Sequence, residues 1–385
     1  MTVIAEPSAR AATGLMFFLA GWCYAAWATR IPAIKDELDL SDGQLGLAIL
    51  GLEAGAIVGL PSGGALVARA GSRLALRIGF VIFPVALVAV AFAPGIVALA
   101  GCLALMAAAN SVVDVAVNAQ GVELEHRCGR SILSGLHAGH PLGLVAGGLA
   151  GAAATAAELP VATHFAIAAL IAGLASLVAC HWLVADPGQR SQPVFARPSR
   201  RLLLLGLIAF CAFLLDGAAY NWTAVHLAGE RGAPEWLAAT AFTLFAITLA
   251  VGRLFGDRLV TRFGRVRVIQ GCGVVAAAGS LLAILAPTTS ATLIGWAVFG
   301  LGLAPLAPTV IGAARGVSRA APGVAIAAVT MIGYLGSFTG PPVIGALAEV
   351  SSLSAALGLL VIISAVTVVL ARPGLSQKGG QGTVR

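Results

Sequence analysis

The stretch VGRLFGDRLVTRFGRVR, residues 251–267, places five arginines and one aspartate between two long apolar runs. Taken alone, it could be a basic patch for nucleic acid, a phosphate-binding loop or a turn between two membrane helices. The composition of the chain decides between them. The 385 residues are 59% hydrophobic and 10% charged, with a mean hydropathy of +0.97. Because a soluble chain of this length needs more charge to cover its surface, these values predict an integral membrane protein.

Apolar runs separated by charged, proline and glycine residues predict about twelve membrane helices, since each crossing needs about 20 apolar residues. The predicted spans are 11–30, 43–67, 74–92, 95–119, 131–156, 161–184, 201–227, 235–256, 267–286, 289–313, 321–348 and 353–371. Residues 186–201 are polar and are predicted to be a cytoplasmic linker between a six-helix half at 1–185 and another at 202–372. Residues 373–385 are predicted to form a disordered cytoplasmic tail. The expected fold is all-α.

The distribution of charge predicts the orientation in the membrane. With the N-terminus in the cytoplasm, only three of the 23 basic residues (Arg30, Lys35 and Arg231) fall in outer loops. The acidic residues show the opposite bias, and eight lie outside: Asp36, Glu37, Asp39, Asp42, Glu158, Glu230, Glu235 and Glu349. This is the positive-inside pattern, which predicts that both termini lie in the cytoplasm. Because topology accounts for the net positive charge, we expect no nucleic-acid partner.

An internal repeat supports two halves of parallel topology. Residues 59–71 match residues 252–264 at six positions with a constant offset of 193: Gly59, Gly63, Leu66, Val67, Arg69 and Gly71 match Gly252, Gly256, Leu259, Val260, Arg262 and Gly264. The same offset carries Gly143 and Gly147 onto Gly336 and Gly340. Two matches at one offset indicate a duplication.

At this point the chain resembles the major facilitator superfamily, whose hallmark is a loop after the second helix of each half. The corresponding loops are GGALVARAGSR at 63–73 and GDRLVTRFGRVR at 256–267. The resemblance assigns a gating role to Gly63, Arg69, Gly71, Arg73, Gly256, Asp257, Arg258, Arg262, Gly264 and Arg265. The acid of the family motif falls on Ala68 and Thr261, which removes a usual cytoplasmic latch. Asp257 could replace it by pairing with Arg253 or Arg258, or could form only an exposed helical pair.

More narrowly, the segments WATRIPAIKDELDLSDGQLG, VDVAVNAQGVELE, DGAAYNWT and GPPVIGALAE are similar to a bacterial inner-membrane branch of that superfamily. The branch includes a rhizopine-locus membrane protein and lies near the fucose-type proton symporters. The resemblance implies that helices 1, 4, 7 and 10 line a central cavity. The first-helix acid of fucose-type symporters has no counterpart, which leaves Tyr24 and Trp27 as aromatic lining and Arg30 at the rim.

Three acidic residues lie well inside predicted spans, where an ionisable side chain costs about 2.5–3.5 kcal/mol on insertion scales: Glu53, Asp114 and Asp216. Asp114 shares a helix face with Asn110 and Asn118, a stripe that could bind hydroxyls or amines or could simply hydrogen-bond another helix.

A second cluster contains Asp216, Tyr220, Asn221 and Trp222, and its aspartate could bind a proton or a cationic group. Glu53 could equally pair within the bundle. His137 and His140 lie near the cytoplasmic start of the fifth helix, where His137 could relay protons or act as an ordinary hydrogen-bonding group.

Glycines 139, 143, 147 and 151 recur every four residues and predict close helix packing. Gly340, Pro341 and Pro342 predict a kink or a break in the eleventh helix.

These features predict a monomeric secondary transporter of the bacterial inner membrane, working by alternating access on a small polar solute such as a sugar, polyol or amino-cyclitol, coupled to protons. Proton-driven efflux of drugs or hydrophobic cations is the alternative, followed by a non-transporting membrane sensor. No GxxxxGK[ST] or HExxH motif is found, so we expect no enzyme activity, cofactor or metal.

Overall fold

The computed structural model describes residues 6–128, 132–185, 199–314 and 322–375, and every regular element within these ranges is a helix. The N-terminal half contains α1 (Glu6–Glu37), α2 (Asp42–Ala70), α3 (Ser72–Val90), α4 (Ile96–Cys128), α5 (Leu133–His137), α6 (Gly139–Ala156) and α7 (Val161–Ala179). The C-terminal half contains α8 (Arg200–Arg231), α9 (Glu235–Phe263), α10 (Arg265–Leu285), α11 (Thr289–Leu303), α12 (Leu306–Ala314), α13 (Pro322–Val350) and α14 (Leu353–Leu375). The predicted all-α fold is confirmed.

Two predicted helices are each divided into two pieces. The span expected at 131–156 is interrupted at Ala138, between α5 and α6, and the span expected at 289–313 is interrupted between α11 and α12. Proline explains both interruptions, because Pro141 and Pro305 have no N–H to donate to the carbonyl one turn earlier. The break that Gly340, Pro341 and Pro342 could have caused is absent, since α13 runs continuously through them. That helix is packed between α8 and α2, and neighbouring helices let a membrane helix tolerate proline.

Several helices extend beyond their predicted ends. α9 continues seven residues past the expected end at 256, to Phe263, and α14 continues to Leu375, which includes the first residues of the expected tail. α8 begins inside the expected linker, where the Ser199 side chain accepts a hydrogen bond from the backbone N–H of Leu202. The rest of the linker (186–198) and of the tail (376–385) lies outside the described residues.

The helix pairings of the first half recur in the second. α2 packs on α4 and α3 packs on α4 and α7, while α9 packs on α11 and α10 packs on α11 and α14. The turn after α2 and the turn after α9 also match, because Gly71 has φ 81° and ψ 158° and Gly264 has φ 80° and ψ 155°. Only glycine adopts this region readily, so both copies of the loop need it. The predicted duplication is therefore visible in the backbone.

α2 and α4 pack backbone to backbone. Four glycines of α2, one on each turn, face four successive turns of α4: Gly51, Gly55, Gly59 and Gly63 lie against Ala100, Ala104, Ala108 and Val112. The glycines of α6 have the same role against α1, as predicted, since Gly143 lies against the backbone carbonyl of Phe18. Small residues of this kind let membrane helices approach closely.

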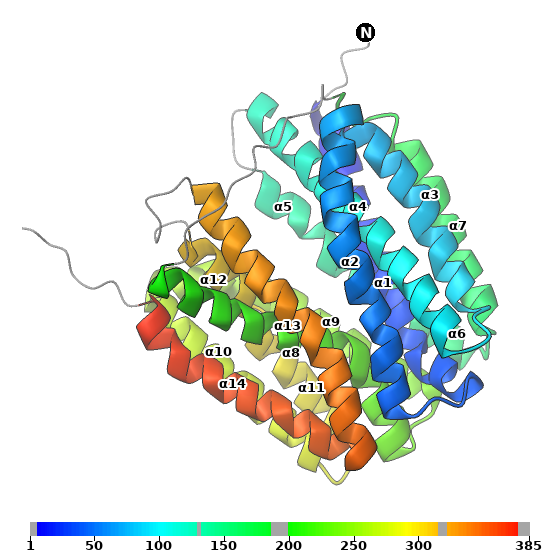
Figure 1. The fold of residues 1–385 in the computed structure, drawn as a ribbon, viewed down its shortest axis with the longest axis vertical. Coiled ribbons are helices and arrows are strands. Elements are labelled where there is room, and N and C mark those ends of the chain that lie inside the picture. The colour runs from blue at the N-terminus through cyan, green and yellow to red at the C-terminus, as the bar shows by residue number, and fades with distance from the viewer. Residues whose placement is uncertain (1–5, 129–131, 186–198, 315–321, 376–385) are drawn as a thin grey trace, which may run out of the picture.

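The two halves lie side by side (Figure 1). Most of the contacts between them join α2 to α13 and α6 to α9, and fewer join α1 to α8 and α9. The α2–α13 crossing is made by glycine on both sides, because a Cβ on Gly46 would lie 3.1 Å from the Cα of Gly345. Beside it, the backbone N–H of Gly43 donates to the Glu349 carboxylate at 3.0 Å. On α6, a Cβ on Gly148 would lie 2.7 Å from the Thr243 hydroxyl of α9.

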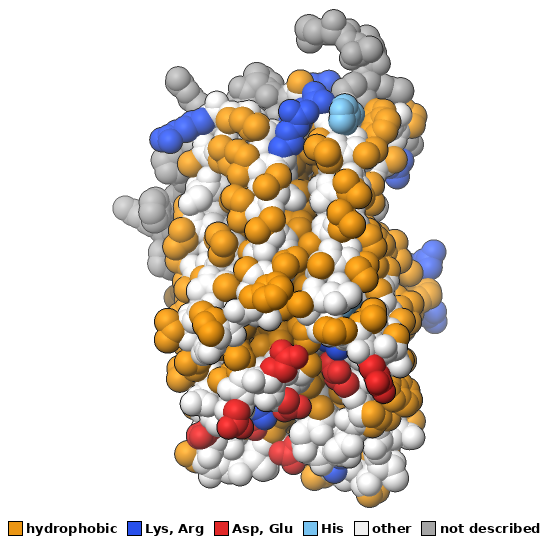
Figure 2. Space-filling view, turned by 90° about the vertical axis from the view of Figure 1, so that its right-hand side faces the viewer, with side chains coloured by type: hydrophobic (Ala, Val, Ile, Leu, Met, Phe, Trp, Pro, Cys, Tyr) orange, Lys and Arg blue, Asp and Glu red, His pale blue; other side chains and the backbone are white. Residues whose placement is uncertain are grey.

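The surface carries a broad apolar belt with charge at its ends (Figure 2). On the face shown, basic side chains gather toward the upper end and acidic side chains toward the lower end. Within the described residues, ten helices are long and apolar enough to cross a membrane by length and composition. We call the lower end in Figure 2 the acidic end and the opposite end the basic end.

Candidate functional site

Polar side chains from both halves gather between them, and we call this group the central polar cluster. It contains Glu53, Asp114, Asn118 and His137 of the N-terminal half with Asp216, Tyr220 and Arg253 of the C-terminal half. All of these residues except Arg253 were predicted from the sequence as binding residues. The acids, Asn118, Tyr220 and Arg253 are partly buried rather than fully exposed, while His137 is exposed.

The N-terminal part of the cluster is a hydrogen-bonded chain. The Asn118 side-chain amide donates to the backbone carbonyl of Asp114 at 2.8 Å and to its carboxylate at 3.1 Å, which confirms that the two share a helix face. The amide oxygen of Asn118 lies 2.9 Å from Nε2 of His137, so the histidine is the donor in this contact. The ring of Phe17 packs 4.5 Å from the His137 ring, centroid to centroid, and fixes its place. α4 and α5 thus present one connected polar surface.

The C-terminal part of the cluster is an ion pair between adjacent helices. Asp216 of α8 lies 3.9 Å from the guanidinium of Arg253 on α9. This is a long contact, and two buried atoms of the pair, Oδ1 of Asp216 and Nε of Arg253, have no hydrogen-bond partner among the described residues. Buried polar atoms are normally satisfied, so both groups retain capacity to bind something else.

Arg253 was missed as a site residue because its helix was expected to end at 256. In the structure α9 extends to Phe263, and Arg253 therefore lies ten residues inside its end. In the structure Arg253 pairs with Asp216. The side chain of Asp257 lies outside the described residues. The signal available in the sequence was the apolar residues continuing past 256.

Three contacts connect the two parts of the cluster across the halves. The rings of Tyr24 and Tyr220 meet edge to face, with centroids 5.5 Å apart. The hydroxyl of Tyr334 on α13 is near enough to Asp114 and Glu53 for an electrostatic interaction. Arg253 is likewise near enough to His137 and His140 for an electrostatic interaction. These residues supply hydroxyl, carboxylate, amide, imidazole and guanidinium groups, which can bind hydroxyl groups and charged groups of a small solute.

The other predicted residues are placed differently. Trp27 and Trp222 are fully buried, and their indole N–H groups have no hydrogen-bond partner among the described residues. Asn221 is buried and donates to the backbone carbonyl of Gly217 at 2.8 Å. Asn110 is half-buried on the same helix as Asp114. Within the described residues, none of these four takes part in the hydrogen-bonded chain of Asp114, Asn118 and His137.

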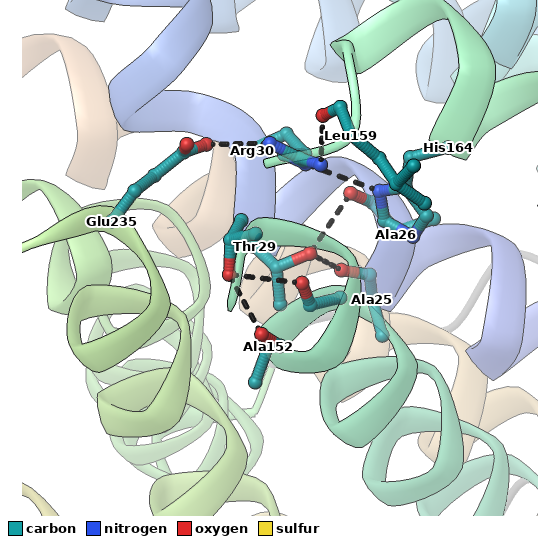
Figure 3. Close-up of polar contacts among 10 residues, drawn as sticks. Ala25, Ala26, Thr29, Arg30, Ala152, Leu159, His164 and Glu235 are labelled. Carbon is teal, nitrogen blue, oxygen red and sulfur yellow. Dashed lines mark hydrogen bonds and ion pairs between the residues drawn. The ribbon is translucent and has the colours of Figure 1, made fainter. Parts of the chain in front are cut away.

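Arg30 belongs to a separate contact between the halves at the acidic end (Figure 3). Its side chain is 2% exposed and donates to Glu235 of α9 at 2.9 Å, which crosses from one half to the other. It also donates to the Leu159 carbonyl at 2.7 Å and to Nδ1 of His164 at 3.3 Å, both in its own half. Arg30 is therefore a buried bridge and not a rim residue open to solvent.

Between this bridge and the central polar cluster lies a small apolar plug built by both halves. It consists of Ala25, Ala28 and Leu144 of the N-terminal half and Phe242 and Ala246 of the C-terminal half, all with 0% exposure. Tyr24 and Tyr220 pack against it. The acidic end is therefore closed by two layers, one apolar and one ionic.

The two loops predicted at the basic end are reduced to single-residue turns at Gly71 and Gly264, and the other predicted gating residues lie on the flanking helices α2, α3, α9 and α10. Arg73 donates to the Cys180 carbonyl at 2.8 Å and so fastens the end of α7. Arg262 lies over the Phe263 ring, 5.4 Å from its centroid, and Arg258 lies 5.9 Å from the centroid of the Phe255 ring. On α9, the Phe255 and Phe263 rings therefore contact the guanidinium groups of Arg258 and Arg262. Gly63 and Gly256 are buried, whereas Arg69 and Arg265 are exposed.

Comparison with known proteins identifies the family. The profile of the Major Facilitator Superfamily matches the chain twice, over residues 13–220 and 205–380. The chain is a member of the major facilitator superfamily. The two matches follow the two halves of the fold, and membership identifies the chain as a multi-pass membrane protein and a secondary transporter of a small molecule.

The relatives in the superfamily include bacterial proteins whose sequences match nearly the whole chain. An uncharacterized MFS-type transporter of Yersinia pestis is 32% identical over 364 residues, covering 92% of this chain and 93% of its own. The membrane protein MosC of Rhizobium meliloti is 29% identical, with 92% and 87% covered, which confirms the resemblance to the rhizopine-locus branch.

Solved transporter structures share the fold at low identity. A crystal structure of the nucleoside transporter NupG superposes with a TM-score of 0.80 at 14% identity and covers 95% of this chain and all of that one. A bacterial homologue of the lysosomal transporter Spinster, in an inward-facing and occupied conformation, gives 0.73 at 15% identity, covering 95% of this chain and 94% of that one. At this identity the likeness concerns the fold.

Proposed function

We propose that this protein moves a small polar solute of the sugar, polyol or amino-cyclitol type across the bacterial inner membrane, coupled to protons. Its basic end faces the cytoplasm, as the positive-inside rule requires, and both termini lie there. The solute binds in the central polar cluster. The observation that carries the proposal is the facing of two polar groups on opposite halves, the Asp114–Asn118–His137 chain and the Asp216–Arg253 pair.

The chemistry of the cluster favours a polar solute over a hydrophobic cation. A solute rich in hydroxyls can donate to the Asp114 and Glu53 carboxylates and accept from Tyr334 or Arg253. A site for hydrophobic cations would instead consist of apolar and aromatic side chains. In this structure the aromatic side chains Tyr24 and Tyr220 lie at the edge of the cluster, against the apolar plug.

The position of the contacts between the halves supports alternating access. The Arg30–Glu235 bridge, the Gly43–Glu349 hydrogen bond and the apolar plug all lie on the side of the cluster toward the acidic end. With that end outside, this conformation is closed to the exterior. Rocking of the halves about α2–α13 and α6–α9 exposes the cluster to the other side, as in transporters built from repeats.

Proton coupling follows from the same residues. A proton on Asp216 removes the negative charge that faces Arg253, and the guanidinium is then free to bind the solute or to interact with the opposite half. A proton on Asp114 changes the end of the Asn118–His137 chain from an acceptor to a donor. Solute and proton therefore compete for, or share, the same carboxylates.

The test begins with a thermal-shift screen of the purified protein against sugars, polyols, amino-cyclitols, amines and dyes, and continues in proteoliposomes with the solute that stabilises most. Asp114→Asn and Asp216→Asn are expected to abolish solute-driven proton movement and to leave the helical content unchanged. Asp36→Asn, which changes an exposed acid of the acidic end, is the control and is expected to transport normally. Normal proton movement in both cluster variants would contradict the coupling, and stabilisation by dyes alone would favour efflux.

A further inference from the structure

A pocket of about 390 Å³ lies at the basic end of the C-terminal half, outside the central polar cluster. It is formed by the turn between α9 and α10 together with the end of α14. Its lining combines Arg265, Arg267, Arg372 and Gln270 with the apolar side chains of Phe263 and Leu375. The pocket therefore has one strongly basic wall and one apolar wall.

The charge of the basic wall is not compensated by the protein. Arg265, Arg267 and Arg372 are exposed, and within the described part of the chain none of their guanidinium groups takes part in a hydrogen bond or an ion pair. Among the described residues, no acidic side chain lines the pocket. The final ten residues, 376–385, contain no acidic side chain either, so the tail does not offer complementary side-chain charge. Three like charges around one cavity repel each other unless an anion lies between them.

The internal repeat shows that the position does not require these arginines. With the offset of 193, Arg265, Arg267 and Arg372 correspond to Ser72, Leu74 and Ala179 of the N-terminal half. That half has an arginine at 73 instead, which donates to the carbonyls of Cys180 and His181 and so completes a helix end. Arg265, Arg267 and Arg372 are therefore present only in the C-terminal half, and among the described residues they form no structural hydrogen bonds there.

We propose that this pocket binds the phosphate headgroup of an anionic phospholipid. Guanidinium groups form paired, charge-assisted hydrogen bonds with phosphate oxygens, and three of them converge here. The pocket lies at the start of α10 and at the end of α14, two helices that are long and apolar enough to cross a membrane, and the end of a membrane helix is at the level of the headgroups in a bilayer. Phe263 and Leu375 supply apolar contact for the glycerol and the first part of the acyl chains.

A bound headgroup has a mechanical effect on the loop. Gly264, the glycine with φ 80°, is part of the pocket and connects α9, which carries Arg253, to α10. A phosphate held jointly by Arg265, Arg267 and Arg372 fastens this turn to the end of α14. The lipid thereby stabilises the seam between α10 and α14, which pack along their length.

The experiment is native mass spectrometry of the full chain, titrated with phosphatidylglycerol, with phosphatidylcholine and with inorganic phosphate alone. Wild-type protein is expected to retain one phosphatidylglycerol in preference to phosphatidylcholine. The triple variant R265Q/R267Q/R372Q is expected to lower the affinity for phosphatidylglycerol at least tenfold. The matched control R10Q/R77Q/R200Q removes the same charge from exposed arginines of the basic end that do not line the pocket, and it is expected to bind like wild type.

Equal losses in both triple variants, or no loss in the pocket variant, would overturn the proposal, because the binding would then be general attraction to a basic surface or would lie elsewhere. Displacement of the lipid by millimolar inorganic phosphate would identify free phosphate as the ligand and also overturn it. Circular dichroism checks the fold of each variant. The single variant R372Q, at the exposed end of α14, gives a second test and is expected to lose several-fold in affinity.

Discussion

Replacing Glu235 with glutamine removes one charge from the bridge between the halves and leaves the rest of the bridge in place. Arg30 keeps its hydrogen bonds to Leu159 and His164, both in its own half, so the variant alters only the link that crosses to α9. We therefore expect the acidic end of the transporter, which we propose faces outward, to open more often. Replacing Arg30 would be less informative, because it also disturbs the N-terminal half.

The size of the effect follows from the geometry. Two unit charges about 4 Å apart attract by about 4 kcal/mol at an effective dielectric constant of 20. Glu235 is 34% exposed, so water screens part of this attraction, and glutamine can still accept a hydrogen bond from Arg30. We expect a net loss of about 1 to 2 kcal/mol, which changes the ratio of closed to open outer ends by about 5- to 30-fold.

The assay measures access to the apolar plug from the acidic end. A cysteine is placed at Ala28, which is fully buried in the plug, in a background without the six native cysteines. The rate at which a membrane-impermeant thiol reagent reacts with it is proportional to the open population. We expect this rate to rise by about the 5- to 30-fold that the lost bridge predicts, and a second reporter at Ala246 on the opposite half should report the same change.

Glu230→Gln is the matched control. Glu230 lies at the same end and accepts hydrogen bonds from Leu353 and Ser354, but these contacts stay within the C-terminal half. Its replacement should leave the labelling rate unchanged. If the rate in Glu235→Gln stayed at the wild-type value, or rose equally in the control, the bridge would not hold the outer end closed.

Two further predictions concern the packing of the halves themselves. Gly143→Ala places a methyl group against the Phe18 carbonyl, and the overpacking should cost about 1–3 kcal/mol of stability and lower the melting temperature. The control Gly101→Ala meets no atom within 4 Å and should leave the melting temperature unchanged. Equal melting temperatures of the two variants would contradict the close contact. Gln120→Leu leaves the buried N–H of Val184 without its 2.9 Å acceptor and should destabilise by about 1–3 kcal/mol in chemical denaturation, whereas a stability within error of wild type would show that the group finds another partner.

The fold could be predicted because its determinants are local or periodic. Apolar length gives the helices, the offset of 193 gives the duplication, and glycine spacing gives the packing of α6 on α1. The ends of the helices were harder to predict, since α9 continues across the expected boundary at 256 to Phe263. The breaks beside Pro141 and Pro305 and the continuity of α13 show that proline alone does not decide whether a membrane helix is interrupted. The packing of the neighbouring helices also decides it.

Most members of the central polar cluster could be selected from the sequence, whereas the side chains that they contact could not. Asp114 and Asn118 are four residues apart, so helical geometry already places them together. The contacts of His137 with Asn118, of Arg253 with Asp216 and of Arg30 with Glu235 join residues on different helices. No spacing within one helix specifies which side chains another helix will bring near.

The glycine crossing of α2 and α13 has a consequence for the work of transport. Interlocked side chains would have to be pulled out of their sockets on every cycle, which makes a seam slow to open. At Gly46 and Gly345 two backbone surfaces touch, and beside them the Gly43 N–H and the Glu349 carboxylate form a hydrogen bond that water can replace after separation. At this point of the seam no interlocked side chains oppose its opening. A protein that must alternate between two states of similar free energy needs a joint of this kind.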